Sequence, residues 1–303
     1  MTVEPLTRRY HPACQLDLRA TLAPLLRLGY GDPTSRLDGG AAWRATRNVD
    51  GAVTISIRRE GDAIALQAWG PGAGHALERG PALLGEEDDD RDFQPTHPLI
   101  RDLHRRHPGV RLCRTEAVME TLLPTVMEQK VIGLEARRGY RRLVRAMGEP
   151  APGPAGLLLQ PSAETLAHTP YWRFHPFAVE RRRAETIIRA AGMAGRLEAL
   201  VAGTTTDART RLEAQPGLGR WSAAHITMIA MGDPDAVPVG DFHLPNIVCH
   251  ALTGVPRGDD AMMLELLEPF RGHRGRVIRL LMMSGIRAPR FGPRLALRHM
   301  EVH

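Results

Sequence analysis

Lysine, cysteine and long apolar segments are scarce in this sequence of 303 residues. Lys130 is the only lysine, so nearly all of the 40 basic residues are arginines, and chemistry that needs a side-chain amine has a single candidate. Cys14, Cys113 and Cys249 lie too far apart for a paired-cysteine metal or redox motif. We therefore expect reduced thiols and no metal site.

No run of about 18 consecutive apolar residues occurs, which argues against a membrane-spanning helix. The N-terminal residues lack the apolar segment and the small-residue cleavage site of a secretory signal. From these two absences we expect a cytoplasmic protein that has no membrane partner.

Basic residues outnumber acidic ones by 40 to 34, which gives a net charge of +6 and a pI near 9.9. This balance favours a polyanionic partner such as nucleic acid. The hydrophobic content of 43% is typical of a globular protein with a core. The length allows two or three compact lobes.

The pattern of secondary structure changes near residue 113. Strand candidates at residues 45–49, 53–57 and 64–68 alternate with turn residues, which predicts a small antiparallel sheet. From about Thr115 the pattern is helical, and Pro124 is expected to end one helix and begin the next. We therefore predict an α+β fold. It has an N-terminal α+β domain at residues 1–112 and a mostly helical domain at residues 113–303.

Residues 207–231 have the pattern of two helices joined by a tight hairpin, and Asp207 can cap the first helix. Gly217 and Gly219 allow the backbone to approach a phosphate closely, and the free N–H groups of the second helix's N-terminus point at it. Leu218 can fill the gap between the two helices. Two glycines around an apolar residue also occur in ordinary helix turns, so the hairpin alone is weak support.

The loop after the hairpin distinguishes it from an ordinary turn. Beyond the second helix lies the motif Val-Pro-Val-Gly-Asp, whose last residue is Asp241. The order of helix, Pro-Gly-Leu-Gly hairpin, helix and Pro-x-x-Asp resembles the helix-hairpin-helix DNA glycosylases. The resemblance is closest to the bacterial DNA-3-methyladenine glycosylase II type. It implies that Gly217 and Gly219 hold a phosphate, that Trp221 lies at the site and that Asp241 is the catalytic carboxylate.

The resemblance covers most of the chain and extends to three further features. It places Gln129 and Lys130 at the DNA-facing tip of the helix before the hairpin. The family's leucine that wedges into the duplex is replaced by Lys130, whose stem can fill part of the gap while its ammonium meets phosphate. Plain solvent exposure of Lys130 is the alternative. A basic helix carries three successive arginines that either contact phosphates or form a solvated face: Arg181, Arg182 and Arg183.

The implied chemistry agrees with the residue types. Breaking an N-glycosidic bond produces a sugar cation in the transition state, which a carboxylate such as Asp241 stabilises electrostatically. On its own, Asp241 would be read as a helix cap or a loop carboxylate. Trp221 occupies the position where bifunctional members carry the lysine that forms a Schiff base, so strand cleavage is not expected. The cysteines of the family's iron–sulfur cluster are also missing, because none follows Cys249.

An alkylated purine is cationic, and aromatic side chains favour it by stacking and by cation–π attraction. Trp221 is the first candidate for such a base pocket. Tyr171, Trp172 and Phe174 are the next candidates, although the segment that contains them can equally be a packed loop in the core.

The resemblance implies a monofunctional DNA glycosylase that releases alkylated purines, of the 3-methyladenine and 7-methylguanine type, in base excision repair. One alternative keeps the fold but acts on deaminated purines such as hypoxanthine; another is a catalytically silent protein that binds damaged DNA. The implied partner is damaged double-stranded DNA, held by Gly217, Leu218, Gly219 and Arg220. Association with the nucleoid follows from DNA binding. No cofactor is expected beyond a monovalent cation at the hairpin carbonyls. We expect a monomer.

Overall fold

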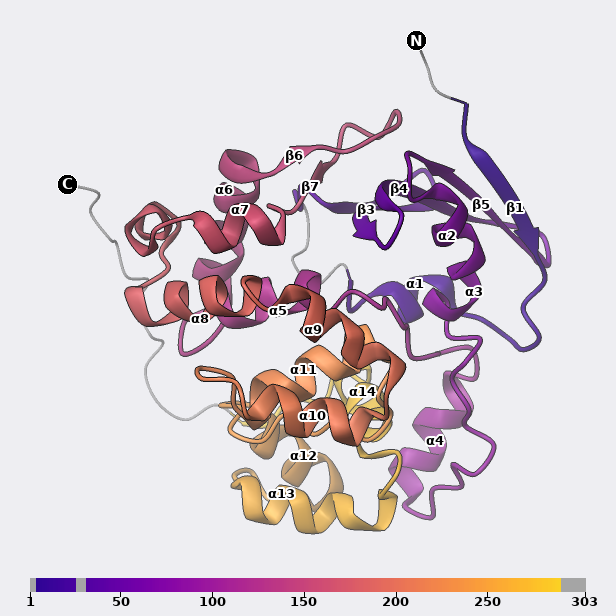
Figure 1. The fold of residues 1–303 in the computed structure, drawn as a ribbon. Helices are drawn as coiled ribbons and strands as arrows, with labels where there is room; N and C mark the ends of the chain where they lie inside the picture. The colour runs from indigo at the N-terminus through magenta and orange to yellow at the C-terminus, as the bar shows by residue number, and fades with distance from the viewer. Residues whose placement is uncertain (1–3, 26–30, 290–303) are drawn as a thin grey trace.

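The N-terminal part of the chain forms a five-stranded antiparallel sheet (Figure 1). The computed structural model describes residues 4–25 and 31–289. The strands lie in the spatial order β1 (Leu6–Tyr10), β5 (Ala63–Trp69), β4 (Gly51–Glu60), β3 (Ala41–Asn48) and β2 (Ser35–Asp38). The three predicted strands are confirmed as β3, β4 and β5. The sequence does not predict β1 and β2, because β1 is almost wholly exposed and β2 has only four residues, so neither shows a clear alternation.

Two tight turns set the register of the central strands. Asn48 pairs with Gly51 across one hairpin, and Glu60 pairs with Ala63 across the next. Gly61, the first loop residue of the second hairpin, has a φ of 65°, a conformation that a two-residue hairpin loop uses at this position. Gly51, which follows the first loop and begins β4, has a φ of 123°. The helix α2 (Ala73–Glu78) packs on β4 and β5, and its apolar side chains share a core with these strands.

Short helices accompany the sheet, and a longer series of helices follows it (Figure 1). The short ones are α1 (Leu18–Leu22) and α3 (Gly80–Leu83). The series comprises α4 (Pro98–Arg106), α5 (Val118–Met127), α6 (Gly133–Met147), α7 (Ala163–His168), α8 (Arg181–Ala191), α9 (Ala194–Glu198), α10 (Thr205–Glu213), α11 (Arg220–Ala230), α12 (Leu244–Thr253), α13 (Asp260–Leu267) and α14 (Arg274–Met283). Three 3₁₀ helices, η1 (Tyr171–Phe177), η2 (Ala199–Ala202) and η3 (Glu268–Phe270), and the short strands β6 (Glu149–Pro150) and β7 (Leu158–Leu159) complete it. In the described part of the chain, no helix is long and apolar enough to cross a bilayer.

The helix α5 lies at the centre of the main helical core and is buried along nearly its whole length. The prediction that Pro124 divides this segment is wrong, because α5 runs through Pro124 and ends at Met127. A proline inside a helix leaves the carbonyl four residues earlier without its donor. Here that carbonyl belongs to Glu120, and it accepts a hydrogen bond of 2.9 Å from Nε2 of Gln160 instead.

A second helical core joins α4 to the C-terminal helices. Ile100 and Leu103 of α4 pack with apolar side chains of α12, α13 and α14. The helix α4 precedes the predicted domain boundary between residues 112 and 113, yet its apolar face is buried among helices that follow that boundary. The buried ion pair between Arg276 of α14 and Asp88 strengthens this attachment, with an N–O distance of 2.5 Å. The α+β and helical parts therefore share this core.

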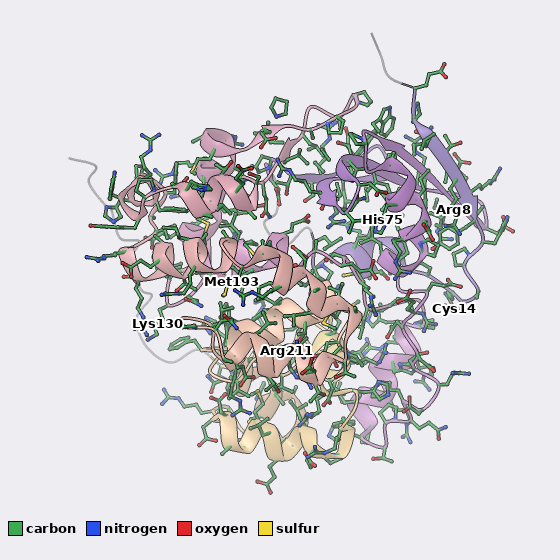
Figure 2. The ribbon with its side chains drawn as sticks, in the orientation of Figure 1. Arg8, Cys14, His75, Lys130, Met193 and Arg211 are labelled. Carbon is green, nitrogen blue, oxygen red and sulfur yellow. The ribbon has the colours of Figure 1, made fainter. Side chains whose placement is uncertain are left out.

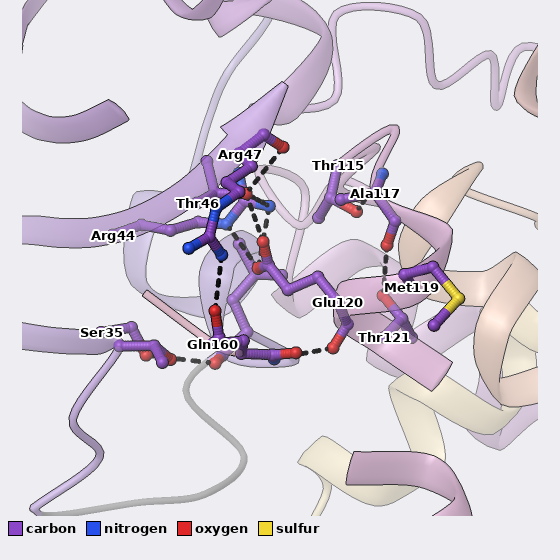
Figure 3. Close-up of polar contacts among 12 residues, drawn as sticks. Ser35, Arg44, Thr46, Arg47, Thr115, Ala117, Met119, Glu120, Thr121 and Gln160 are labelled. Atoms are coloured by element: carbon purple, nitrogen blue, oxygen red, sulfur yellow. Dashed lines mark hydrogen bonds and ion pairs between the residues drawn. The ribbon is translucent and has the colours of Figure 1, made fainter. Parts of the chain in front are cut away.

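A polar cluster joins the sheet to α5 (Figure 3). Arg44 of β3 is buried, and its Nε donates a hydrogen bond of 3.0 Å to the Glu120 carboxylate, which also accepts from the Thr46 hydroxyl. Arg47 donates to the carbonyl of Gln160, whose amide in turn holds the free carbonyl of Glu120. The strand β3 is thus bonded to the first turn of α5, the helix that leads to the predicted DNA-facing tip.

Candidate active site

The predicted helix-hairpin-helix is present as α10, a tight turn and α11. Asp207 does not cap α10: Thr204 is the N-cap, and its side chain accepts from the backbone N–H of Asp207. The helix begins before the predicted start, so Asp207 lies in its first turn. Gly217 has a φ of 91°, and a Cβ at this position would overlap Oγ1 of Thr186 in α8. Glycine is therefore required at 217 both by conformation and by close packing.

The rest of the hairpin faces in two directions. The Leu218 side chain is 4% exposed and packs in the main helical core, so it fills the gap between the helices as predicted and does not itself face DNA. Gly219 is the N-cap of α11, no side chain of the described residues caps this helix, and a Cβ on Gly219 would meet nothing within 4 Å. Arg220 is exposed beside it. The open N–H groups of α11 therefore form a site that suits a phosphate.

The tip of α5 is bonded to this hairpin. Nε2 of Gln129 donates to the carbonyl of Gly217 and to Oγ of Ser222, both at 2.9 Å. Gln129 thus uses both amide hydrogens to hold the hairpin, so only its side-chain carbonyl remains for DNA. Lys130 follows with a φ of 54° and an exposed side chain, and Figure 2 shows it at the edge of the molecule.

Asp241 is held by three donors at the start of α12. Its Oδ2 accepts a hydrogen bond of 2.9 Å from Nε1 of Trp221. Its Oδ1 accepts from the backbone N–H groups of His243 and Leu244, at 2.8 Å and 2.9 Å. Burial alone would raise the pKa of Asp241, but these hydrogen bonds outweigh burial and leave its pKa below the usual value. The carboxylate is consequently ionised and fixed in orientation at neutral pH.

The loop before Asp241 is supported from a second helix. The carboxylate of Asp260, in the first turn of α13, accepts from the backbone N–H of Gly240 at 3.0 Å. Gly240 has a φ of 91°, and the N–H of Asp241 bonds the carbonyl of Pro238 at 3.3 Å. The sequence gives no local signal for the contact with Asp260, because the two residues meet only when α13 folds back onto the loop.

Two further aromatic residues lie at this site without having been predicted there. The His225 ring packs edge-on against Trp221, with ring centroids 4.4 Å apart. Its spacing of four residues from Trp221 on one helix is a signal that sequence analysis could have used. Phe242, next to Asp241, is 78% exposed and lies edge-on to His243. A phenyl ring this exposed beside a fixed carboxylate is suited to contact a ligand.

The predicted aromatic residues of η1 have different environments. The Phe174 side chain is fully buried in the main helical core, so its ring has no free face for a base and the prediction of a pocket role is wrong for this residue. Tyr171 is partly buried, and Trp172 is 58% exposed. Among the hydrogen bonds and ring contacts of the described residues, none joins Tyr171 or Trp172 to Trp221.

The three arginines at the start of α8 also differ in burial and in their partners. Arg183 is 7% exposed and donates to the carbonyls of Met127 and Ala178, at 2.8 Å and 2.9 Å. It therefore joins the ends of α5 and η1, and the prediction that it contacts phosphate is wrong. Arg181 is exposed but pairs with Glu185 at 2.7 Å. Arg182 is exposed and remains a candidate for DNA contact.

Comparison with known proteins gives one group of sequence relatives and many structural ones. No family model matches the sequence. The chain is 36% identical over 151 residues to the probable bifunctional transcriptional activator/DNA repair enzyme AlkA of two Mycobacterium tuberculosis strains. This match covers 48% of the chain and 30% of the relatives, so the chain matches less than a third of their length.

The fold matches solved structures over nearly its whole length. A 3-methyladenine DNA glycosylase from Archaeoglobus fulgidus superimposes with a TM-score of 0.73 at 18% identity, over 91% of this chain and 98% of that one. An 8-oxoguanine glycosylase/lyase from Clostridium acetobutylicum superimposes with a TM-score of 0.70 at 13% identity, over 93% and 98%. At these identities the structures establish the arrangement of sheet and helices.

Proposed function

We propose that this chain is a member of the helix-hairpin-helix superfamily of DNA glycosylases, as its partial sequence similarity and its fold support, and that it hydrolyses the N-glycosidic bond of alkylated purines in DNA. One observation carries the proposal: Asp241 is an ionised carboxylate held by three donors, one of which is the side chain of Trp221 in the helix that the hairpin begins. The phosphate site and the carboxylate therefore belong to one rigid unit.

The arrangement suits cleavage through a sugar cation. The hairpin holds the phosphate backbone through N–H groups at the start of α11. A damaged nucleotide must leave the base stack to reach the carboxylate, which costs a few kcal/mol, and less for a weakened base pair. As the bond to the base breaks, positive charge develops on the sugar, and Asp241 stabilises that charge without needing to reorient. The base departs with the bonding electrons, and a water molecule bonds to the anomeric carbon of the sugar cation and releases a proton to solvent.

Trp221 is the residue that supports a preference for alkylated purines. It is partly buried, its N–H is engaged by Asp241, and its ring remains the natural surface for stacking a cationic base. Phe242, the residue after Asp241, adds an exposed aromatic ring. Tyr171 and Trp172 lie on η1, which packs on α6 and α8, so we no longer assign them to this pocket.

We further propose that base release occurs without strand cleavage. The position that follows Arg220 in α11 carries Trp221, which has no amine to attack the sugar. The only lysine, Lys130, extends from the tip of α5. Borohydride reduction of a reaction mixture should therefore trap no protein–DNA adduct. An adduct that forms with the wild type and is lost in Lys130→Ala would instead identify Lys130 as a nucleophile.

The deciding experiment compares base release from methylated duplex DNA by the wild type and by Asp241→Asn. We expect free 3-methyladenine or 7-methylguanine from the wild type only, while both proteins bind damaged duplex. The asparagine keeps an acceptor for the N–H groups of His243 and Leu244, so the fold should survive. Release by Asp241→Asn would refute the catalytic assignment. Release of hypoxanthine alone would change the lesion, and no release from a folded, DNA-binding wild type would favour a silent binder.

A further inference from the structure

An exposed tryptophan lies on η1 among basic side chains, and among the hydrogen bonds and ring contacts of the described residues none joins it to Asp241 or Trp221. The Trp172 side chain is 58% exposed and is braced edge-on by Tyr171, with ring centroids 5.3 Å apart and planes at 84°. The guanidinium of Arg181 lies over the Tyr171 ring at 4.7 Å. These contacts fix the Trp172 ring and leave much of its surface open to solvent. Such a ring beside arginines is the arrangement that stacks nucleic acid bases.

A stripe of arginines on α6 borders η1. Arg138, Arg142 and Arg145 are exposed, and their spacing places them on one side of the helix. Gly139, on the same helix, touches η1 so closely that a Cβ there would overlap the carbonyl oxygen of Phe177. Because Arg142 is offset by only about 60° from Gly139 around the helix, this stripe flanks the end of η1 at Phe177, in the same element that carries Trp172.

The charges of this surface are mostly uncompensated. No ion pair involves Arg138 or Arg142 within the part of the chain that the structure describes. The nearby carboxylates are Glu185, which pairs with Arg181, and Glu180, which lies 3.7 Å from Nε of the buried Arg183. Glu135, in the first turn of α6, adds a third negative charge one turn before Arg138, so the arginines of this surface outnumber its carboxylates. The exposed Arg173 and Arg182 add to the positive charge. A polyanion is therefore the complementary partner.

The helix α8 connects this surface to the hairpin. The backbone of Gly217 rests on Thr186 in the middle of α8. At the start of the same helix, Arg183 donates to the carbonyl of Ala178, which ends η1, and to that of Met127 at the tip of α5. The five residue steps of α8 from Thr186 back to Arg181 span about 7.5 Å, which corresponds to about two nucleotides at 3.4 Å each. A strand held at the hairpin can therefore continue onto η1.

We propose that η1 and the arginine stripe of α6 bind a single-stranded segment of DNA that flanks the lesion, with one unpaired base stacked on Trp172. Duplex DNA would offer phosphates to the arginines but no open base face to the ring, so the exposed tryptophan favours a single strand. The proposal rests on the proposed function, because it extends the DNA path from the same hairpin. Its consequence is that the protein prefers lesions near junctions between duplex and single-stranded DNA.

The test measures binding of a duplex that contains a stable abasic-site analogue, with and without a single-stranded thymidine tail on either side. The tail should tighten binding by the wild type. Trp172→Ala should lose that gain, about fivefold to 100-fold for one stacked base, while its affinity for the blunt duplex stays the same. Trp172→Phe should keep most of the gain. The double variant Arg138→Glu/Arg142→Glu should flatten the salt dependence of tailed-probe binding, by about 0.7 for each phosphate that is no longer neutralised.

The matched control is Arg101→Glu in α4, an exposed arginine on the opposite side of the molecule from α6 and α8 (Figure 1). It changes the net charge by two units, half of the change in the double variant, and should leave the tail-dependent gain intact. A tail that gives no gain in the wild type, or a gain that survives Trp172→Ala, overturns the proposal. Binding requires no base release, so loss of catalysis in the wild type would refute the proposed function and leave this measurement interpretable.

Discussion

Replacing Trp221 with phenylalanine removes one hydrogen bond from Asp241 and keeps an aromatic ring. The bond runs from Nε1 to Oδ2 at 2.9 Å, and a hydrogen bond to a charged group contributes about 1.5–3 kcal/mol. The pKa of Asp241 is lowered because three such bonds outweigh burial. Loss of the bond from Trp221 should therefore raise the pKa of Asp241, because burial is then opposed by two donors instead of three.

The pH dependence of base release reports this shift. The ionised carboxylate is the active form, so activity falls as the pH drops through the pKa of Asp241. In Trp221→Phe this acidic limb should move to higher pH. Single-turnover release from methylated DNA, corrected for release from DNA alone, gives the profile, and weaker base stacking would lower affinity without moving the limb. Trp172→Phe, the same exchange outside the site, is the control. An unmoved limb in Trp221→Phe would refute the role of this hydrogen bond.

Two further predictions concern stability. Gly217→Ala should lower the free energy of unfolding by about 1–3 kcal/mol, because the φ of 91° strains an alanine and its Cβ overlaps Thr186; Gly219→Ala should change it by less than about 0.5 kcal/mol and weaken DNA binding instead. Equal thermal denaturation of the two variants would contradict this contrast. Glu120→Ala should cost about 3 kcal/mol in urea unfolding because it leaves Arg44 buried and unpaired. Adding Arg44→Met should recover part of that loss, and strictly additive losses would disprove the coupling.

The features predicted correctly from the sequence are those that depend on short stretches of chain. The hairpin and the loop that ends on Asp241 follow from glycines and prolines at fixed spacing, because proline fixes φ and glycine permits the positive φ that tight turns need. The strands β3, β4 and β5 follow from alternation of apolar and polar residues between two-residue turns. The filling role of Leu218 also follows locally, since an apolar residue between two glycines has only the gap between the helices to enter.

Features that depend on a partner far along the chain could not be predicted. Pro124 ends a helix only if the freed carbonyl of Glu120 stays unpaired, and the pairing by Gln160 comes from a loop 40 residues further along the chain. Arg183 has the same sequence context as its two neighbours, but its position on α8 points it at the carbonyl of Met127. Phe174 becomes a core residue for the same reason, since the turn of η1 directs it inward. In each case the residue type determines which contacts the side chain can make, and tertiary packing determines which of them it does make.

The conformation of the α5 tip makes position 130 tolerant of substitution. Gln129 anchors the backbone on one side through the hairpin, so the next residue needs no side-chain contact to keep the loop in place. Substitution there can alter what is presented to the duplex while the carboxylate and the phosphate site stay unchanged. The φ of 54° limits the choice, because branched side chains such as valine and isoleucine are disfavoured in that region. Unbranched residues, asparagine and glycine form the set from which variants with new lesion preferences can be selected.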